Sequence, residues 1–379
     1  MFSVYMALML FQTNYLRLGT ILAFGTLFLT LFFAIIDRQV TFSSRAFPKV
    51  NWCLIAFLVI AFFVSEIHYG VPDYYFKLVA QAILCIALWD MRLNEREERF
   101  LLSIYVVSVC IYGLLILYAV SQSVAHSRIV LFNTTLDPNF IGIPFSTASI
   151  IVLHQLITGK KRFLKLIALI FAYLVMILTI VSTASRGTFV GLVVSSIMLL
   201  TVFIFQRRLS FLYKLMVIIV MILLGTLLLR FVTTNYLYAW NRIINFGEGA
   251  DNGRIDLWKA AILEWEEHPL LGIGLQGMYR GVSGVENHNT FVQILCETGV
   301  IGAFLVFPFL SSIIRIAYRR GYQYVCMFIA LLLQIAFLDA IDNRCVWIVI
   351  CWINMLRVKD TNAGLSIDIE SSEEELKER

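Results

Sequence analysis

The chain has few charged residues. Asp, Glu, Lys and Arg make up 15% of its 379 residues, against roughly 25% in soluble globular proteins. Hydrophobic residues make up 60%, and Phe alone accounts for 30 positions. A soluble core has no room for so much apolar surface, and a disordered chain or a nucleic-acid binder needs more charge than this. The composition excludes these three classes and indicates a membrane protein.

The chain also lacks the usual signatures of metal binding and secretion. Its 7 cysteines lie in apolar runs, with no CxxC pair and no Cys/His cluster at metal-ligand spacing, so they are expected to be buried hydrophobic residues. The segments predicted below to face outward contain no DxD-like acidic pair, and a divalent-metal site is therefore unsupported. Residues 1–17 have neither a basic start nor a small-residue cleavage site, so we expect no removable signal peptide.

Long apolar runs are what the chain has instead. The first and last of these runs are too short to cross ~30 Å of hydrocarbon unaided, because a helix rises ~1.5 Å per residue. The pattern predicts an all-α, polytopic membrane protein with about 11–12 transmembrane helices. The runs fall near residues 1–12, 18–36, 50–64, 74–89, 101–120, 140–157, 163–181, 188–205, 211–231, 290–314, 322–338 and 345–357.

These runs divide the chain into four parts. Residues 1–231 form the first part of the transmembrane bundle, 232–289 a long outer loop, and 290–357 the last part of the bundle. Residues 358–379 form an acidic tail with few aromatic residues, which is expected to be a disordered, cytoplasmic extension.

The distribution of basic residues predicts the orientation. Most of the 30 Lys and Arg residues fall in connecting segments on one side of the predicted membrane, and that side is expected to be cytoplasmic. Both termini then lie in the cytoplasm. The more elaborate connections lie outside, and the functional site is expected among them. These outer segments are 65–73, 121–139, 182–187 and 232–287.

The long outer loop is predicted to contain a helix of its own. Four apolar residues recur at positions i, i+3, i+4 and i+7, between a possible N-cap at Asn252 and a helix end before Pro269. The apolar face could lie at the lipid boundary or pack on the bundle, and the sequence leaves both open. The four residues are Trp258, Ala261, Ile262 and Trp265.

A polar stripe enters the membrane helix that follows this loop. Asn289, Gln293 and Glu297 lie at i, i+4 and i+8 on one face, which must turn toward a cavity or partner helices. His288 precedes them at the helix mouth. Its imidazole is available in the neutral form near pH 7, which suits a general base that accepts a proton from a sugar hydroxyl.

Arg186 lies where one apolar run ends and the next begins, so it is placed at the membrane edge. A guanidinium there needs a partner. That partner is either a carboxylate, an ordinary lipid phosphate, or a substrate pyrophosphate, which arginine binds in bidentate fashion. The candidate carboxylates are Asp137, Asp339 and Asp342. For Asp137, an Asx turn or helix N-cap is the simpler interpretation.

Four segments carry a family resemblance. They read LDPNF, STASRGTFVGL, NGRIDLWKAAILEWEEHPLLGIGL and ENHNTFVQILCETGVIG, and they span residues 137–302 approximately. In this order and on this topology they resemble the O-antigen ligase and polymerase superfamily of bacterial envelope polysaccharide synthesis.

The resemblance implies a metal-independent, cofactor-free membrane glycosyltransferase with a helical bundle of the C type in the bacterial inner membrane. Its active site would lie on the periplasmic face and act on glycans carried by undecaprenyl pyrophosphate. Arg186 and Arg254 would bind the pyrophosphate, and His288 would activate the acceptor, with inversion at the anomeric carbon. Further possible substrate-binding residues are Asn139, Asn289, Arg128 and Arg280.

Two branches of the superfamily and one other class remain open. A polymerase joins two lipid-linked repeat units, whereas a ligase transfers the glycan to lipid A–core in lipopolysaccharide synthesis. The sequence favours a polymerase, because its outer basic residues form no dense patch for a phosphorylated core. Transport or flipping is less favoured, because helices such as 167–181 and 215–229 are almost wholly apolar. The resemblance also implies a chain-length regulator and a flippase as partners, and no nucleic acid.

Overall fold

The computed structural model describes most of the chain. Arg128, Asn252, the tail 358–379 and most of the apolar run 18–36 lie outside the described residues, so the predictions that concern them stay predictions. The described residues are 2–9, 25, 28–29, 32–33, 36, 49–89, 93–122, 130–131, 134–158, 162–206, 210–244 and 253–356.

The described part of the chain is almost wholly helical, as predicted. A short π-helical turn, η1 (Met278–Val282), and an antiparallel pair of strands, β1 (Val130–Leu131) and β2 (Thr134–Thr135), are the exceptions among named elements. The helices are α1 (Phe2–Met9), α3 (Lys49–His68), α4 (Asp73–Ala87), α5 (Glu95–Gln122), α6 (Pro138–Ile157), α7 (Phe163–Ser182), α8 (Arg186–Phe205), α9 (Phe211–Asn235), α10 (Leu237–Ile244), α11 (Arg254–Glu267), α12 (Thr290–Arg320), α13 (Tyr322–Ile335) and α14 (Arg344–Met355).

Seven of these helices are long and apolar enough to cross a membrane: α3, α5, α6, α7, α8, α9 and α12. Two shorter apolar helices, α13 and α14, accompany them. In α9, Val232 is the one buried side chain, so apolar residues cover the helix on all sides and require an apolar surrounding. The fold is that of an all-α, polytopic membrane protein. The total of 11–12 spans stays a prediction.

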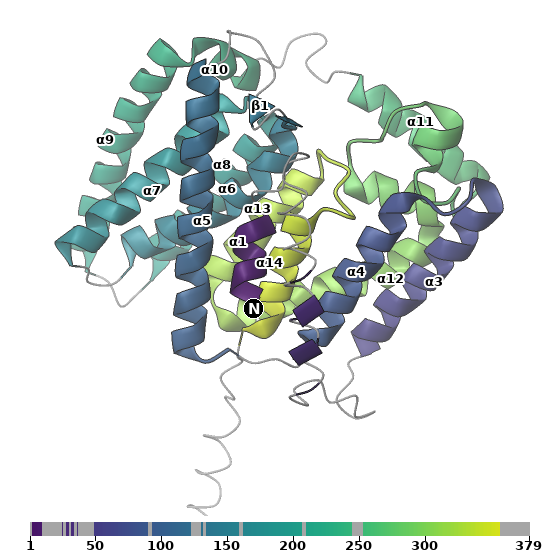
Figure 1. The fold of residues 1–379 in the computed structure, drawn as a ribbon. Helices are drawn as coiled ribbons and strands as arrows, with labels where there is room; N and C mark the ends of the chain where they lie inside the picture. The colour runs from purple at the N-terminus through teal and green to yellow at the C-terminus, as the bar shows by residue number, and fades with distance from the viewer. Residues whose placement is uncertain are drawn as a thin grey trace, which may run out of the picture.

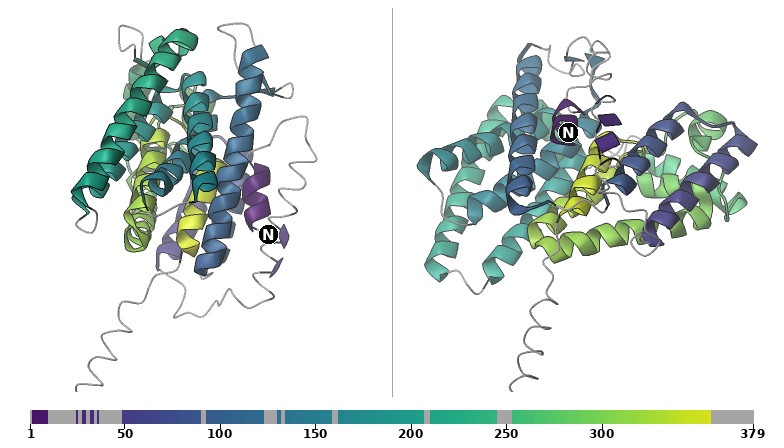
Figure 2. Two further views of the ribbon diagram at one scale, coloured as in Figure 1. Left: turned by 90° about the vertical axis from the view of Figure 1, so that its left-hand side faces the viewer. Right: turned by 60° about the horizontal axis from the view of Figure 1, so that its bottom comes forward.

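The helices form two groups joined by a central pair. Figure 1 shows α5 to α10 on one side, α3, α4, α11 and α12 on the other, and α13 and α14 between them. The turned views in Figure 2 show the same grouping. Helix α13 makes the connection, because it packs against α6 and α8 in one group and against α12 in the other. Residues that follow α13 therefore lie where the two groups meet.

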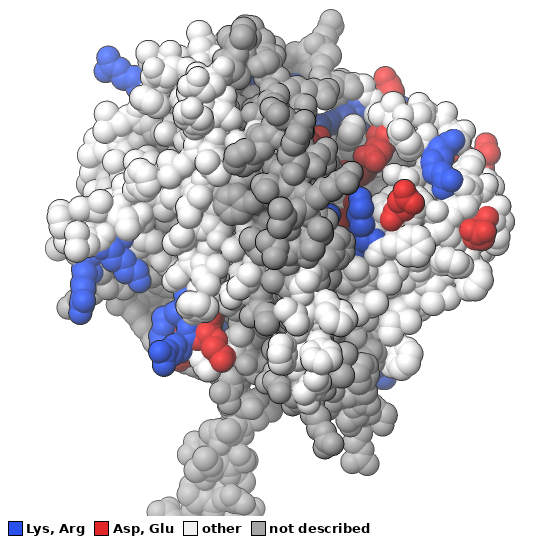
Figure 3. Space-filling view, viewed as in Figure 1, with Lys and Arg blue, Asp and Glu red and all other residues white. Residues whose placement is uncertain are grey.

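Charged side chains occupy the two ends of the molecule. In Figure 3 they gather at the lower left, near the lower ends of α5, α7 and α9, and at the upper right around α11. Few of the described residues visible between these two regions are charged. A surface with few charges is what a bilayer requires of the residues that face it.

Helix α12 is broken at Gly299, whose φ of 63° and ψ of −168° are not helical. The loop that follows α11 satisfies the freed backbone groups. Ile273 and Gly274 donate their N–H groups to the carbonyl oxygens of Cys296 and Glu297, at 3.0 and 2.9 Å. On the far side of the break, the N–H of Val300 donates to Pro269, and that of Ile301 to Leu270, at 2.9 and 3.2 Å. The break is therefore a docking site for the loop.

We expect Gly299→Ala to destabilise the protein. A Cβ at Gly299 would overlap the backbone of Leu270, and the positive φ alone costs an L-residue about 1–3 kcal/mol. The midpoint of thermal unfolding of purified protein measures the effect. The matched control is Gly225→Ala in the exposed helix α9, where nothing lies within 4 Å of an added Cβ. Equal midpoints for the two variants would contradict the docking role of the break.

Candidate active site

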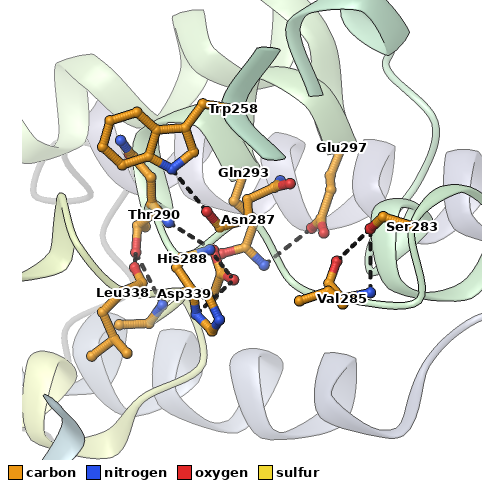
Figure 4. Close-up of polar contacts among 12 residues, drawn as sticks. Trp258, Ser283, Val285, Asn287, His288, Thr290, Gln293, Glu297, Leu338 and Asp339 are labelled. Atoms are coloured by element: carbon orange, nitrogen blue, oxygen red, sulfur yellow. Dashed lines mark hydrogen bonds and ion pairs between the residues drawn. The ribbon is translucent and has the colours of Figure 1, made fainter. Parts of the chain in front are cut away.

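A carboxylate from the turn between the two central helices fixes His288. The Oδ2 atom of Asp339, in the turn after α13, accepts the backbone N–H of His288 at 2.7 Å, and Oδ1 accepts that of Asn289 at 3.1 Å. Figure 4 shows the carboxylate beneath the turn. His288 has a φ of +53°, a left-handed conformation that a non-glycine residue keeps only when its surroundings hold it. The two hydrogen bonds to Asp339 provide that restraint.

The same turn is fixed by the start of α12. Asn289 is the N-cap, and its Oδ1 accepts the N–H groups of Phe291 and Val292 at 3.0 and 3.2 Å. Thr290 donates its hydroxyl to the carbonyl oxygen of Leu338 at 2.5 Å and accepts the N–H of Ala340 at 3.0 Å. Asn289 thus has a structural role, and its predicted contact with substrate stays a prediction.

Helix α11 supports the site from above. The indole Nε1 of Trp258 donates to the carbonyl oxygen of Asn287 at 2.9 Å (Figure 4). Ala261, also on the predicted apolar face, is fully buried in a cluster with Cys296 of α12. The sequence left open whether this face lies at the lipid boundary or packs on the bundle. For Trp258 and Ala261, the structure shows packing on the bundle. The helix starts after Gly253, which occupies the N-cap position predicted for Asn252.

Two arginines from separate helices reach the same region. Arg186 is the first residue of α8 and Arg254 the first of α11. Burial lowers the pKa of Arg254, and so do the nearby guanidinium groups of Arg186 and Arg242, against the opposing carboxylates of Asp137 and Asp339. The Nε of Arg186 donates to the carbonyl oxygen of Arg242 at 3.1 Å. Neighbouring cations at helix N-termini create a positive potential that a bound anion would relieve.

The imidazole of His288 is kept neutral. Burial lowers its pKa, and the positive charge of Arg254 lowers it further, while the carboxylates of Glu286 and Asp137 oppose the shift. Burial also raises the pKa of Asp339 to about 6. The Nδ1 atom of His288 lies 4.0 Å from Oδ2 of Asp339. The site therefore combines an uncharged base with fixed cations, an arrangement suited to deprotonating a hydroxyl beside an anionic leaving group.

Asn139 joins two helices behind the arginines. Asp137 is the N-cap of α6, where its Oδ1 accepts the N–H of Asn139 at 2.7 Å, which confirms the simpler interpretation of Asp137. The Oδ1 of Asn139 accepts the hydroxyl of Ser185, the N-cap of α8, at 2.8 Å. The Nε2 of Gln334 on α13 donates to the carbonyl oxygen of Asn139, also at 2.8 Å. These bonds fix the start of α8 and with it the backbone of Arg186.

Comparison with protein families identifies one region of the chain. Residues 171–307 match the family model described as O-Antigen ligase. The similarity to the O-antigen ligase family is thus confined to this segment, which is less than half of the chain. Comparison with curated proteins gave no match. The family consists of glycosyltransferases of the ligase and polymerase type that act on lipid-linked glycans.

The matched segment 171–307 does not contain the whole site. It extends from within α7 into α12 and includes Arg186, Arg254 and His288, whereas Asn139 and Asp339 lie before and after it. Packing of α6 and α13 against α8 brings Asn139, and the turn after α13 that carries Asp339, back to the matched segment. The site is therefore a product of the whole bundle.

Arg280 lies within the matched segment, in η1. Its Nη1 donates to the carbonyl oxygen of Gly70, at 2.6 Å, in the turn between α3 and α4. Close by, a Cβ on Gly281 would overlap the ring of Tyr69. Arg280 thus ties η1 to the bundle, and its predicted contact with substrate stays untested.

The polar stripe of α12 turns toward a partner helix. Glu297 is buried, and its Oε2 accepts the hydroxyl of Tyr74 on α4 at 3.1 Å and the Nε2 of Gln293 at 3.3 Å. The sequence predicted either a cavity or partner helices for this face, and for Glu297 the structure shows the partner. The network connects α4 to the segment of α12 that begins beside His288.

Sequence reasoning missed four residues of this region. Asp339 was considered only as a partner for Arg186, and Arg242, Glu286 and Tyr74 were not considered. The signal for Asp339 was its place in a short polar turn between two apolar runs, at residues 339–344. No pattern in the sequence signals the other three, because their relevance depends on contacts between distant helices.

The two pKa shifts predict how activity depends on pH. A general base must be unprotonated, and the lowered pKa of His288 keeps it so at neutral pH. Asp339 becomes protonated near pH 6 and then loses the negative charge that faces the turn. We expect kcat/KM to be constant near pH 7 and to fall as the pH drops through about 6 and below. A rate that continued to rise toward acid pH would exclude His288 as the base.

Proposed function

We propose that the protein is a polymerase of lipid-linked polysaccharide repeat units of the O-antigen or capsule type. It would transfer a glycan from undecaprenyl pyrophosphate to a terminal sugar hydroxyl of a second lipid-linked unit. The observation that supports this best is the neutral imidazole of His288 near the guanidinium group of Arg254, which in turn lies near that of Arg186. The match of residues 171–307 supports the same class of chemistry.

The chemistry follows from these three side chains. His288 accepts the proton of the acceptor hydroxyl. The oxygen of that hydroxyl attacks the anomeric carbon of the donor from the face opposite the pyrophosphate. The bond from that carbon to the pyrophosphate oxygen breaks, and undecaprenyl pyrophosphate leaves with the electron pair. Arg186 and Arg254 stabilise the negative charge that develops on it, because fixed cations away from bulk water need no reorganisation. The anomeric configuration is inverted, and no metal takes part in the proposed mechanism.

Ligation to lipid A–core is the second candidate. The description of the matched family as O-Antigen ligase favours it. The surface of α11 favours the polymerase instead, because its four acidic residues outnumber its two basic ones. A heavily phosphorylated acceptor would be repelled by this surface, whereas a neutral or weakly charged glycan would not. The four acids are Asp256, Glu264, Glu266 and Glu267.

The proposal includes a location and partners. The site would lie on the periplasmic face of the bacterial inner membrane, with both termini in the cytoplasm, as the basic residues predict. A flippase would deliver the lipid-linked units to this face, and a chain-length regulator would act on the product. Both partners follow from the family resemblance.

We expect His288→Ala and Arg254→Ala each to lower glycosyl transfer at least about 100-fold, because each removes a group that acts on the reacting atoms. The measurement is polymer formation by purified protein in lipid. The control is Lys259→Ala on the same helix as Arg254, where an exposed lysine lies 3.4 Å from Asp256. It should retain activity. Full activity in the His288 variant would exclude its role as the base.

One assay distinguishes the two acceptors. Purified protein receives a single undecaprenyl-pyrophosphate-linked repeat unit, and the products are separated by size. A ladder of longer lipid-linked glycans is expected, because the donor and acceptor are then the same compound. Transfer that occurs only after lipid A–core is added would identify a ligase and contradict the polymerase proposal.

A further inference from the structure

A polar cavity of about 270 Å³ lies between the ends of four helices. Its walls come from the start of α5, the end of α6, and the first turns of α7 and α13. Its volume is near the lower limit of small-molecule sites. The polar side chains used below are Glu98, Gln155, Lys165 and Gln323.

This cavity lies at the end of the bundle away from His288. Helix α6 begins at Pro138, beside Asn139 of the candidate active site, and ends at Ile157, beside the cavity. A helix of 20 residues is about 30 Å long, at ~1.5 Å per residue. The cavity is therefore separated from the active site by about the thickness of a bilayer. It lies at the end that the basic residues predict to be cytoplasmic.

The cavity has one side chain of each charge. The ammonium of Lys165 forms no ion pair within the described part of the chain. Oε1 of Glu98 accepts the hydroxyl of Tyr324, and no described side chain donates to Oε2. Gln155 and Gln323 add neutral amide groups between them. A ligand that carries both an anionic and a cationic group complements this lining.

Exposed apolar side chains flank the cavity. Phe163 and Leu164 directly precede Lys165, and they are 74% and 80% exposed. A polar cavity beside an apolar surface at the end of a membrane bundle fits an amphipathic ligand, with its headgroup inside and its chains along the surface.

We propose that this cavity binds the headgroup of a zwitterionic aminophospholipid. Lys165 binds the phosphate, and the amide N–H groups of Gln155 and Gln323 donate to its oxygens. The free oxygen of Glu98 accepts a hydrogen bond from the ammonium. The acyl chains lie along Phe163 and Leu164. This site is independent of glycosyl transfer. Whether or not the lipid binds there, the proposed function is unaffected.

Native mass spectrometry of the delipidated, full-length protein tests the proposal. The protein is titrated with phosphatidylethanolamine, with phosphatidylglycerol of the same acyl chains, and with soluble phosphoethanolamine. We expect one phosphatidylethanolamine to bind at least about tenfold more tightly than phosphatidylglycerol, because only the former carries a cation for Glu98. Lys165→Gln and Glu98→Gln should each weaken that binding about tenfold. The glutamine at position 98 still accepts from Tyr324, so the helix packing is kept.

Two variants outside the cavity serve as controls. Lys214→Gln, in the first turn of α9, and Glu95→Gln, one turn before Glu98, remove the same charges and should leave binding unchanged. Equal affinity for the two lipids would overturn the role of Glu98. Binding that survives Lys165→Gln would overturn the cavity as the site. Soluble phosphoethanolamine that binds as tightly as the lipid would show that a free headgroup compound, and not a lipid, is the ligand.

Discussion

The break in α12 is the constraint on which the rest of the structure depends. A helix inside a membrane cannot leave backbone N–H and C=O groups without partners, because no water is there to replace them. Gly299 interrupts the helix, and the segment 269–274 supplies the missing donors and acceptors. The loop is thereby fixed against the bundle, and α11 is fixed with it. The start of α11 carries Arg254, so a backbone requirement determines where this candidate pyrophosphate-binding residue lies.

The second determinant is the meeting of two helix groups at α13. The turn after α13 presents Asp339 to the backbone of His288, which directly precedes α12 in one of the two groups. On the opposite side of α13, Gln334 bonds to Asn139 and to Thr188, which lies two residues after Arg186. His288 and the start of α8, which carries Arg186, are thus both positioned by contacts to α13 and the turn that follows it. This arrangement explains why the site includes residues outside the matched segment 171–307.

Much of the helical framework could be predicted from the sequence. The run predicted at 163–181 corresponds to α7 at Phe163–Ser182, and the loop helix predicted before Pro269 corresponds to α11. Such elements follow from local patterns, because an apolar run long enough to cross a bilayer has no alternative to a helix. The interruption of α12 was not predicted. Gly299 lies in an otherwise helical pattern, and only the loop that pairs with it makes the break stable.

The sequence by itself determined the class of the protein and most of its helices, because composition and spacing are local properties, and the family resemblance supplied the three candidate residues Arg186, Arg254 and His288. The tertiary structure decided which of these side chains lie near one another. The lowered pKa of His288 depends on its burial and on Arg254, which lies 34 positions earlier in the chain. Its backbone conformation depends on Asp339, which follows 51 positions later. The electrostatic interaction between two charged groups depends on the distance between them in space, and only the packing of the helices determines that distance.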